Sequence, residues 1–179
     1  MAVQVQGQNR GFTLVEVLVA LFVLAVGIVG AGAAQLSAQR LRQHAALSSE
    51  AAQLAAALAA RMRVNPAVAG LPDASNPYLG FHYDAAGAPA NSPIAPLPCF
   101  GGTACTPAQL AAFDLHELRR ALHAQFPGGR IEVCRDGSPW DSAASRFRWS
   151  CDGDAGALPV VKLGWQGTLG APGYVTVLR

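Results

Sequence analysis

The sequence has few charged residues, and their signs are nearly balanced. Asp, Glu, Lys and Arg make up 13% of the 179 residues, and the formal net charge is +2. A nucleic-acid-binding domain usually carries a clustered basic face. Here, pairs such as Arg40 with Arg42 and Arg61 with Arg63 are expected to form solvated helix faces. We therefore expect no nucleic-acid partner.

The chain also lacks the short motifs of common enzyme sites. It contains no G-x-S-x-G, no Walker phosphate loop and no H-E-x-x-H. His116 and His123 are seven residues apart, but no third ligand lies within sequence reach, and His82 is expected near the surface. No ordered calcium loop ending in Glu is present, so turn positions are expected for Asp136, Asp141, Asp152 and Asp154. We predict no catalytic residue, metal ligand, cofactor or small-molecule substrate.

Cysteine is absent from the first half of the chain and then occurs four times, at Cys99, Cys105, Cys134 and Cys151. None belongs to a C-x-x-C pair, which favours disulfides in an oxidising compartment over zinc binding or thiol redox chemistry. The sequence leaves three pairings open. We expect Cys99 with Cys105 and Cys134 with Cys151, because nearest-neighbour pairing closes two local loops.

Ionisable residues are almost absent from residues 12–34, where the only one is Glu16. A helix of this length spans roughly 35 Å, enough to cross a hydrocarbon layer of about 30 Å. A carboxylate at membrane depth costs about 2.5 to 3.5 kcal/mol, so Glu16 is expected to have a partner or a task. Alternatively, it lies close enough to the helix start to reach the headgroups and to interact favourably with the helix dipole.

The run Gly11-Phe12-Thr13-Leu14-Val15-Glu16, between a polar leader and this apolar span, resembles the processing site of type IV pilins and pseudopilins. The resemblance covers residues 1–35. It implies that a prepilin peptidase cuts between Gly11 and Phe12 and methylates the new amine of Phe12. It also implies that Glu16 pairs with the N-terminus of a neighbouring subunit, where a cationic amine neutralises the carboxylate.

Four segments follow from this interpretation: a cleaved leader (1–11), a transmembrane and assembly half-helix (12–34), an amphipathic half-helix (35–64) and a disulfide-stapled globular domain (65–179). Both half-helices are expected to form one helix of about 50 residues. Its second half carries an apolar stripe of Leu47, Leu54, Leu58 and Met62. The pair Asn65-Pro66 is expected to end it.

Glycines interrupt the apolar half-helix at Gly27, Gly30 and Gly32. Each costs up to about 1 kcal/mol relative to alanine in a helix. They indicate either close helix packing within a membrane or a segment that melts when the helix leaves the membrane for a filament, as the resemblance implies.

The globular domain is predicted to begin with an irregular surface connection over 66–98, with one short strand near Tyr78–Tyr83. Thr106, Pro107 and Gln109 predict a capped helix start, and Pro127-Gly128-Gly129 predicts its end. Beyond this, an antiparallel meander is expected, with strands at 130–135, 146–151, 158–166 and 174–178. The fold class is α+β: a long N-terminal helix on a small antiparallel sheet with one additional helix, similar to the pilin fold.

The resemblance implies a structural role. Three segments resemble type IV pilus minor pilins of the PilV kind: the run 16–21, the glycine-rich half of the span and Cys105–Gln109. This resemblance implies that the chain primes pilus assembly together with other minor pilins and the assembly machinery, near the pilus tip. It also implies a part in twitching motility and adhesion. The alternative is a minor pseudopilin of a type II secretion system. A different class is a membrane-tethered periplasmic binding module that is never processed.

The expected location is the bacterial inner membrane, crossed once, with the C-terminal domain in the periplasm. Positive charges alone do not fix this orientation, since Arg10 precedes the span while Arg40 and Arg42 follow it. The cysteines and the processing motif outweigh that count.

Overall fold

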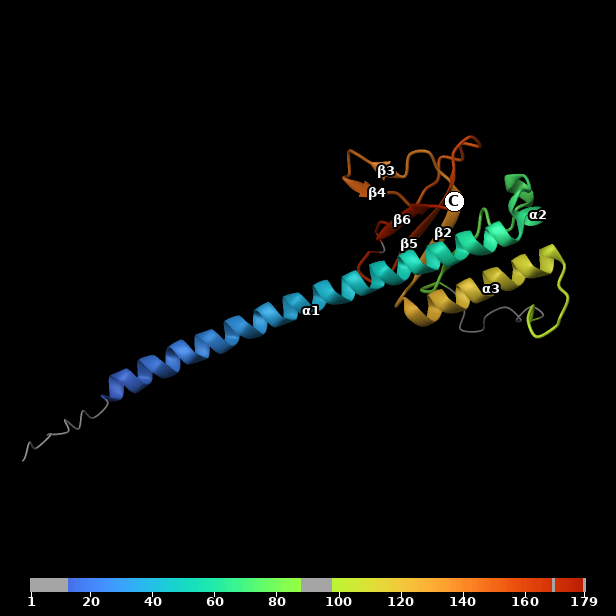
Figure 1. Ribbon diagram of the computed structural model, residues 1–179. Helices are drawn as coiled ribbons and strands as arrows, with labels where there is room; N and C mark the ends of the chain where they lie inside the picture. The colour runs from blue at the N-terminus through green and yellow to red at the C-terminus, as the bar shows by residue number, and fades with distance from the viewer. Residues whose placement is uncertain (1–12, 88–97, 169, 179) are drawn as a thin grey trace, which may run out of the picture. The chain divides into compact units, whose positions relative to one another are not determined.

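The computed structural model describes residues 13–87, 98–168 and 170–178. Gly11 and Phe12 lie outside the described residues. By its internal contacts the chain divides into two units, Met1–Ala45 and Ala46–Arg179. The helix α1, Leu14–Val64, contributes residues to both (Figure 1).

Helix α1 has 51 residues, as the sequence predicts, and is continuous through Gly27, Gly30 and Gly32. The expected stop is confirmed at its end, where α2, Pro66–Ala69, follows directly after Asn65. A short 3-10 helix, η1, comprises Asp73–Ser75. Proline begins α2 at a position where its missing N–H has no helical partner to lose.

Helix α3, Pro107–Gln125, has the predicted capping box. The Gln109 N–H donates to Thr106 Oγ1 over 3.3 Å, and the Thr106 N–H donates to Gln109 Oε1 over 2.9 Å. The helix ends at Gln125 with Phe126 as its C-cap, and Gly128 follows with a φ of 60°, a left-handed conformation that suits glycine. Both predicted ends of this helix are therefore confirmed.

The main sheet has four antiparallel strands in the order β1-β2-β5-β6. These strands are β1 His82–Asp84, β2 Arg130–Arg135, β5 Pro159–Gly164 and β6 Tyr174–Val177. Three of them lie within predicted strand segments, whereas β1 shares only His82 and Tyr83 with the predicted short strand. Strand β2 pairs directly with β5, so the residues between them, 136–158, form an excursion outside the sheet, which we call the β2–β5 excursion.

The prediction of a sheet strand at residues 146–151 was wrong. Only Arg146–Phe147 form a strand, β4, which pairs with β3, Trp140–Asp141, in a separate two-stranded ribbon. Local turn bonds close this ribbon: Asp141 Oδ1 accepts from the N–H groups of Ala143 and Ala144. Arg146 and Phe147 therefore pair with β3 of the same excursion and not with β2 of the main sheet.

One face of the sheet and the two helices enclose the core of the second unit. Inward-facing residues of β2 and β5 pack against residues of α1 and α3. The strands contribute Ile131, Val133, Val161 and Leu163, and the helices contribute Leu58, Met62, Leu118 and Leu122. Leu47 and Leu54 are only partly buried, whereas Ala51 and Ala55 are fully or almost fully buried. Small side chains on α1 therefore face the core, which permits close packing. The architecture is α+β and pilin-like, as predicted.

A buried polar network connects the end of α1, the loop after it and the start of α3. Tyr78 Oη donates to Asp114 Oδ2 over 2.8 Å, and Asn65 Nδ2 lies 3.3 Å from Tyr78 Oη. Asn65 Nδ2 also donates to the carbonyl of Pro107 over 2.8 Å. Arg61 Nη1 reaches the carbonyl of Asp114 at 3.1 Å and its carboxylate at 3.5 Å. The long connection is thus held to both helices by satisfied buried groups.

Candidate assembly segment and the covered sheet face

The start of α1 carries local capping contacts around Glu16. The Glu16 N–H lies 3.3 Å from Thr13 Oγ1 and 3.1 Å from the carbonyl of Thr13. Thr13 is the residue before the helix, and Thr13-Leu14-Val15-Glu16 has the form of a capping box, S/T-x-x-E. Glu16 also stands in the first turn, where its charge interacts favourably with the helix dipole.

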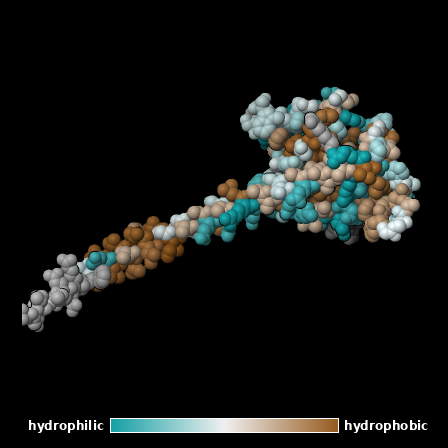
Figure 2. All heavy atoms as spheres, in the orientation of Figure 1, coloured by the Kyte–Doolittle hydropathy of each residue, from teal (hydrophilic) through white to brown (hydrophobic). Residues whose placement is uncertain are grey.

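Glu16 is followed along the helix by an apolar face lined by Val17, Ala20, Leu21 and Leu24. Leu21 is 61% exposed and Leu24 is 59% exposed. Hydrophobic residues gather along this part of α1 (Figure 2). Within the described ranges, α1 is the one helix long and apolar enough to cross a membrane. So large an exposed apolar surface requires lipid or other protein chains to cover it.

The structure pairs the cysteines as nearest neighbours, the pairing expected from the sequence. Cys99 and Cys105 are joined with 5.7 Å between their Cα atoms, directly before the Thr106 cap of α3. Cys134 of β2 and Cys151 of the excursion are joined with 6.4 Å between their Cα atoms. The first bond closes a local loop, whereas the second holds the β2–β5 excursion to the sheet.

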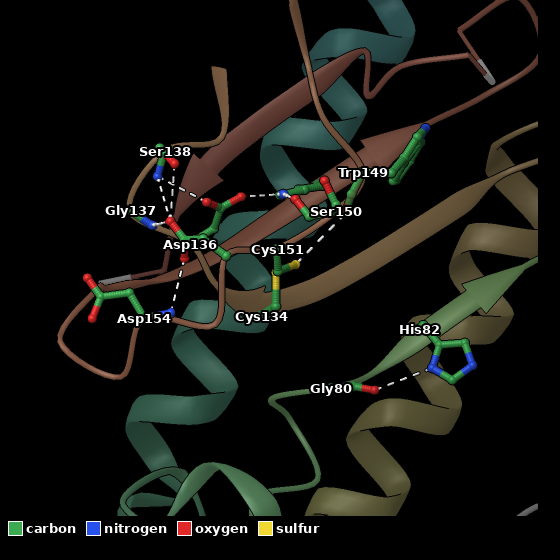
Figure 3. The surroundings of a disulfide bond; sticks show 12 residues. Gly80, His82, Cys134, Asp136, Gly137, Ser138, Trp149, Ser150, Cys151 and Asp154 are labelled. Atoms are coloured by element: carbon green, nitrogen blue, oxygen red, sulfur yellow. Dashed lines mark hydrogen bonds and ion pairs between the residues drawn. A yellow bond between two sulfur atoms is a disulfide. The ribbon is translucent and has the colours of Figure 1, made fainter. Parts of the chain in front are cut away.

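The sequence interpretation missed a buried ion pair under this excursion. Lys162, in the middle of β5, and Asp136, directly after β2, both have fully buried side chains. Lys162 Nζ donates to Asp136 Oδ2 over 2.5 Å and to the carbonyl of Ser150 over 2.6 Å. Figure 3 shows Asp136 and Ser150 beside the Cys134–Cys151 disulfide. The available sequence signal is a single lysine within the apolar run Val160-Val161-Lys162-Leu163.

Trp149 of the excursion covers the same outer face of the sheet. The guanidinium of Arg130 lies 4.3 Å from the centroid of the Trp149 ring. Arg130 and Gly164 are opposite each other in the β2–β5 register. A Cβ on Gly164 would lie 2.7 Å from Trp149 Cζ2, so glycine permits the ring to approach the sheet.

The four aspartates of this region serve as turn residues, as predicted, since each accepts from the backbone N–H two residues further along the chain. Asp141 accepts backbone N–H bonds, and Asp154 Oδ1 accepts from the Gly156 N–H over 2.9 Å. Asp152 Oδ2 accepts from the Gly137 N–H over 2.9 Å. The pKa of Asp152 is lowered mainly by the hydrogen bond that its carboxylate accepts from the Asp154 N–H. The bond from the Gly137 N–H lowers it further. Asp136 accepts from the Ser138 N–H through Oδ1 and is in addition paired with Lys162 through Oδ2.

The three histidines considered as ligands do not meet in the structure at a common site. His123 Nδ1 lies 3.1 Å from the hydroxyl of Tyr83, and His82 Nδ1 lies 3.4 Å from the carbonyl of Gly80. Among the residues that the structure describes, no group of three or more His, Cys, Asp or Glu side chains is arranged to hold a metal ion.

Comparison with protein families supports the assignment of the N-terminal segment. The prokaryotic N-terminal methylation motif, typical of type IV pilins and pseudopilins, matches residues 7–32. The matched range includes Gly11, Phe12 and Glu16. Comparisons with curated proteins and with solved structures give no match.

Proposed function

We propose that this chain is a minor pilin, a structural subunit that helps to initiate type IV pilus assembly after processing by a prepilin peptidase. The observation that carries the proposal is the coincidence of the methylation motif with the start of α1. The motif covers residues 7–32, and the described helix begins at Leu14 with Glu16 in its first turn. Cutting after Gly11 leaves Phe12 as the new N-terminus, two residues before Leu14 in the sequence.

In this proposal, residues 1–11 form the leader, residues 12–34 enter the inner membrane and later the filament, residues 35–64 continue the helix, and residues 65–179 form the periplasmic domain. The exposed apolar side chains of α1 agree with the second role, because lipid or neighbouring helices would cover them. The partners are the prepilin peptidase, other minor pilins and the assembly machinery. The resemblance to minor pilins of the PilV kind favours a position near the pilus tip.

The second candidate is a minor pseudopilin of a type II secretion system, which shares the same processing motif. The irregular, disulfide-bonded region before α3 favours the pilus assignment. Deletion of the gene distinguishes the two. If the chain is a minor pilin, the deletion should reduce surface pili and leave secretion unchanged. If it is a pseudopilin, the deletion should reduce secretion and leave pili unchanged.

Processing is tested by Gly11→Val, with Gly7→Val in the same leader as the matched control. A side chain at Gly11 is expected to obstruct the approach of the peptidase to the scissile bond, so the leader stays attached. Gly7→Val should be processed normally. Mass spectrometry of the membrane-extracted protein is the readout. A normally methylated Phe12 in the Gly11→Val protein, or an uncleaved leader in the wild type, would refute the proposed processing.

A further inference from the structure

The Lys162–Asp136 pair is enclosed by protein on the outer face of the sheet. Both side chains are 0% exposed, and Nζ lies 2.5 Å from Oδ2. Lys162 Nζ therefore contacts Asp136 Oδ2, the atom bonded directly to the carboxyl carbon Cγ. Removing two charges from water is costly even when they are paired. A reaction that leaves neither charge would remove that cost.

We propose that Lys162 and Asp136 are joined by an isopeptide bond that forms after folding. Lys162 Nζ attacks Asp136 Cγ, the Cγ–Oδ2 bond breaks, and Oδ2 leaves as water. The Lys162 ammonium first gives one proton to the Asp136 carboxylate, so that the neutral amine attacks. Of its three hydrogens, two leave with Oδ2 as water and the amide nitrogen keeps the third. No oxidant, cofactor or activated donor is required.

The surrounding groups match the needs of this condensation. The N–H of Ser138 donates to Asp136 Oδ1 over 3.0 Å, where negative charge develops in the tetrahedral intermediate. The carbonyl of Ser150, 2.6 Å from Nζ, accepts the hydrogen that the amide nitrogen retains. Both reacting groups are held in contact by the fold, which removes most of the entropic cost of bringing them together.

A second carboxyl group is available to move protons. Glu132 is directly opposite Lys162 in the β2–β5 register, so the two side chains share the outer face of the sheet. Burial raises the pKa of Glu132, which favours its protonated form. In the proposed reaction, Glu132 takes a proton from the attacking nitrogen and gives one to the departing oxygen.

The proposed bond and the Cys134–Cys151 disulfide would hold the same excursion by different chemistry. The disulfide joins β2 to Cys151, and the isopeptide would join Asp136 to the middle of β5. A reductant removes the first and leaves the second. This difference allows the proposed bond to be detected in reduced protein.

The test is peptide mapping of the full chain, purified from membranes in detergent, then denatured, reduced, alkylated and digested with trypsin. The bond is expected to block cleavage after Lys162 and to link peptide 136–146 to peptide 149–179. The linked species should weigh one water less than the sum of the two peptides. Separate peptides with cleavage after Lys162 would show an ion pair only and would overturn the proposal.

Two variants locate the bond. Lys162→Arg keeps the positive charge but has no amine, so it should yield no linked species. Asp136→Asn should yield the linked species of the same mass as the wild type, because ammonia leaves in place of water. A link that persists in Lys162→Arg would place the bond on another residue and contradict the assignment.

Discussion

Tyr78 and Asp114 are 36 residues apart in the chain and share a hydrogen bond of 2.8 Å in the domain interior. Tyr78 has no exposed surface, and Asp114 is 5% exposed. Together with Asn65 they connect the loop after α1 to the first half of α3. This bond therefore fixes a segment that has little regular structure of its own.

Tyr78→Phe removes the hydroxyl and leaves the Asp114 carboxylate without that donor. The free energy of unfolding should fall by about 1 to 3 kcal/mol, the cost of an unsatisfied buried acceptor. Tyr83→Phe is the matched control, because the Tyr83 hydroxyl bonds to the exposed His123 ring and its loss should cost less. Urea unfolding of both proteins in detergent provides the measurement. Equal stability of the two variants would contradict the role of the buried bond.

The same hydroxyl predicts a loss of stability at alkaline pH. Burial is the main cause that raises the pKa of Tyr78 from 10.0 to about 12. Because the folded pKa lies above the unfolded one, the contribution to stability is complete below pH 10.0 and is lost as pH rises toward about 12. The loss amounts to at most about 1.4 kcal/mol per pH unit.

The contribution of the Tyr78 hydroxyl is isolated by measuring the difference in unfolding free energy between wild type and Tyr78→Phe across this pH range. The other titrating groups are common to both proteins. The difference should shrink as pH rises. A constant difference would show that the hydroxyl does not titrate differently in the folded and unfolded chains.

The two disulfides should differ in their effect on stability. They span 17 and 6 residues of sequence, so the chain-entropy account gives about 3 kcal/mol for Cys134–Cys151 and about 2 kcal/mol for Cys99–Cys105. The first also holds the excursion over the sheet. Replacing both cysteines of each pair by serine avoids free thiols. Thermal unfolding should show the larger loss for the Cys134/Cys151 variant, and an equal or reversed order would contradict this assignment.

Gly164→Ala tests the approach of Trp149 to the sheet. The added Cβ would lie 2.7 Å from Trp149 Cζ2 and 3.0 Å from Cη2, so the ring must move away. Overpacking of this kind typically costs about 1 to 3 kcal/mol. Gly170→Ala is the control, because nothing lies within 4 Å of its added Cβ. The expected result is reduced stability and altered tryptophan fluorescence for Gly164→Ala alone.

Local signals allowed much of this fold to be predicted. The capping box at Thr106, the Asn65-Pro66 stop and the glycines after α3 act within a few residues, so their outcome can be inferred from the sequence. The strands β2, β5 and β6 also follow from short runs of β-forming residues bounded by turns.

Contacts between distant residues could not be predicted in the same way. Arg146 begins a segment with strand-like composition, but Asp141 closes a local ribbon that removes it from the main sheet. The alternation of Lys162 with the inward-facing Val161 and Leu163 places Lys162 on the outer face of β5. No residue near Lys162 in the sequence indicates that Asp136 bonds to it there. Alanines rather than leucines dominate the buried face of α1, because the space between packed elements decides which side chain fits.

Glu16 has two competing roles, helix capping and recognition of a neighbouring subunit. Its position three residues after Thr13 suits a capping box, and the Glu16 N–H is within bonding distance of Thr13 Oγ1. The proposed function instead requires its charge, to pair with the Phe12 amine of a neighbouring subunit. Glu16→Gln separates these roles, because glutamine can also complete a capping box but carries no charge.

If recognition depends on charge, Glu16→Gln and Glu16→Ala should both insert and be cleaved, yet both should enter the assembly complex poorly. Thr13→Ala weakens the cap while leaving the carboxylate, so it should assemble nearly as well as wild type. Crosslinking to the other minor pilins and counts of surface pili, in cells lacking the wild-type copy, provide the two readouts. Normal assembly of Glu16→Gln together with failure of Thr13→Ala would assign Glu16 to helix capping, because only the local hydrogen bonds, and not the charge, would then be needed for entry into the complex.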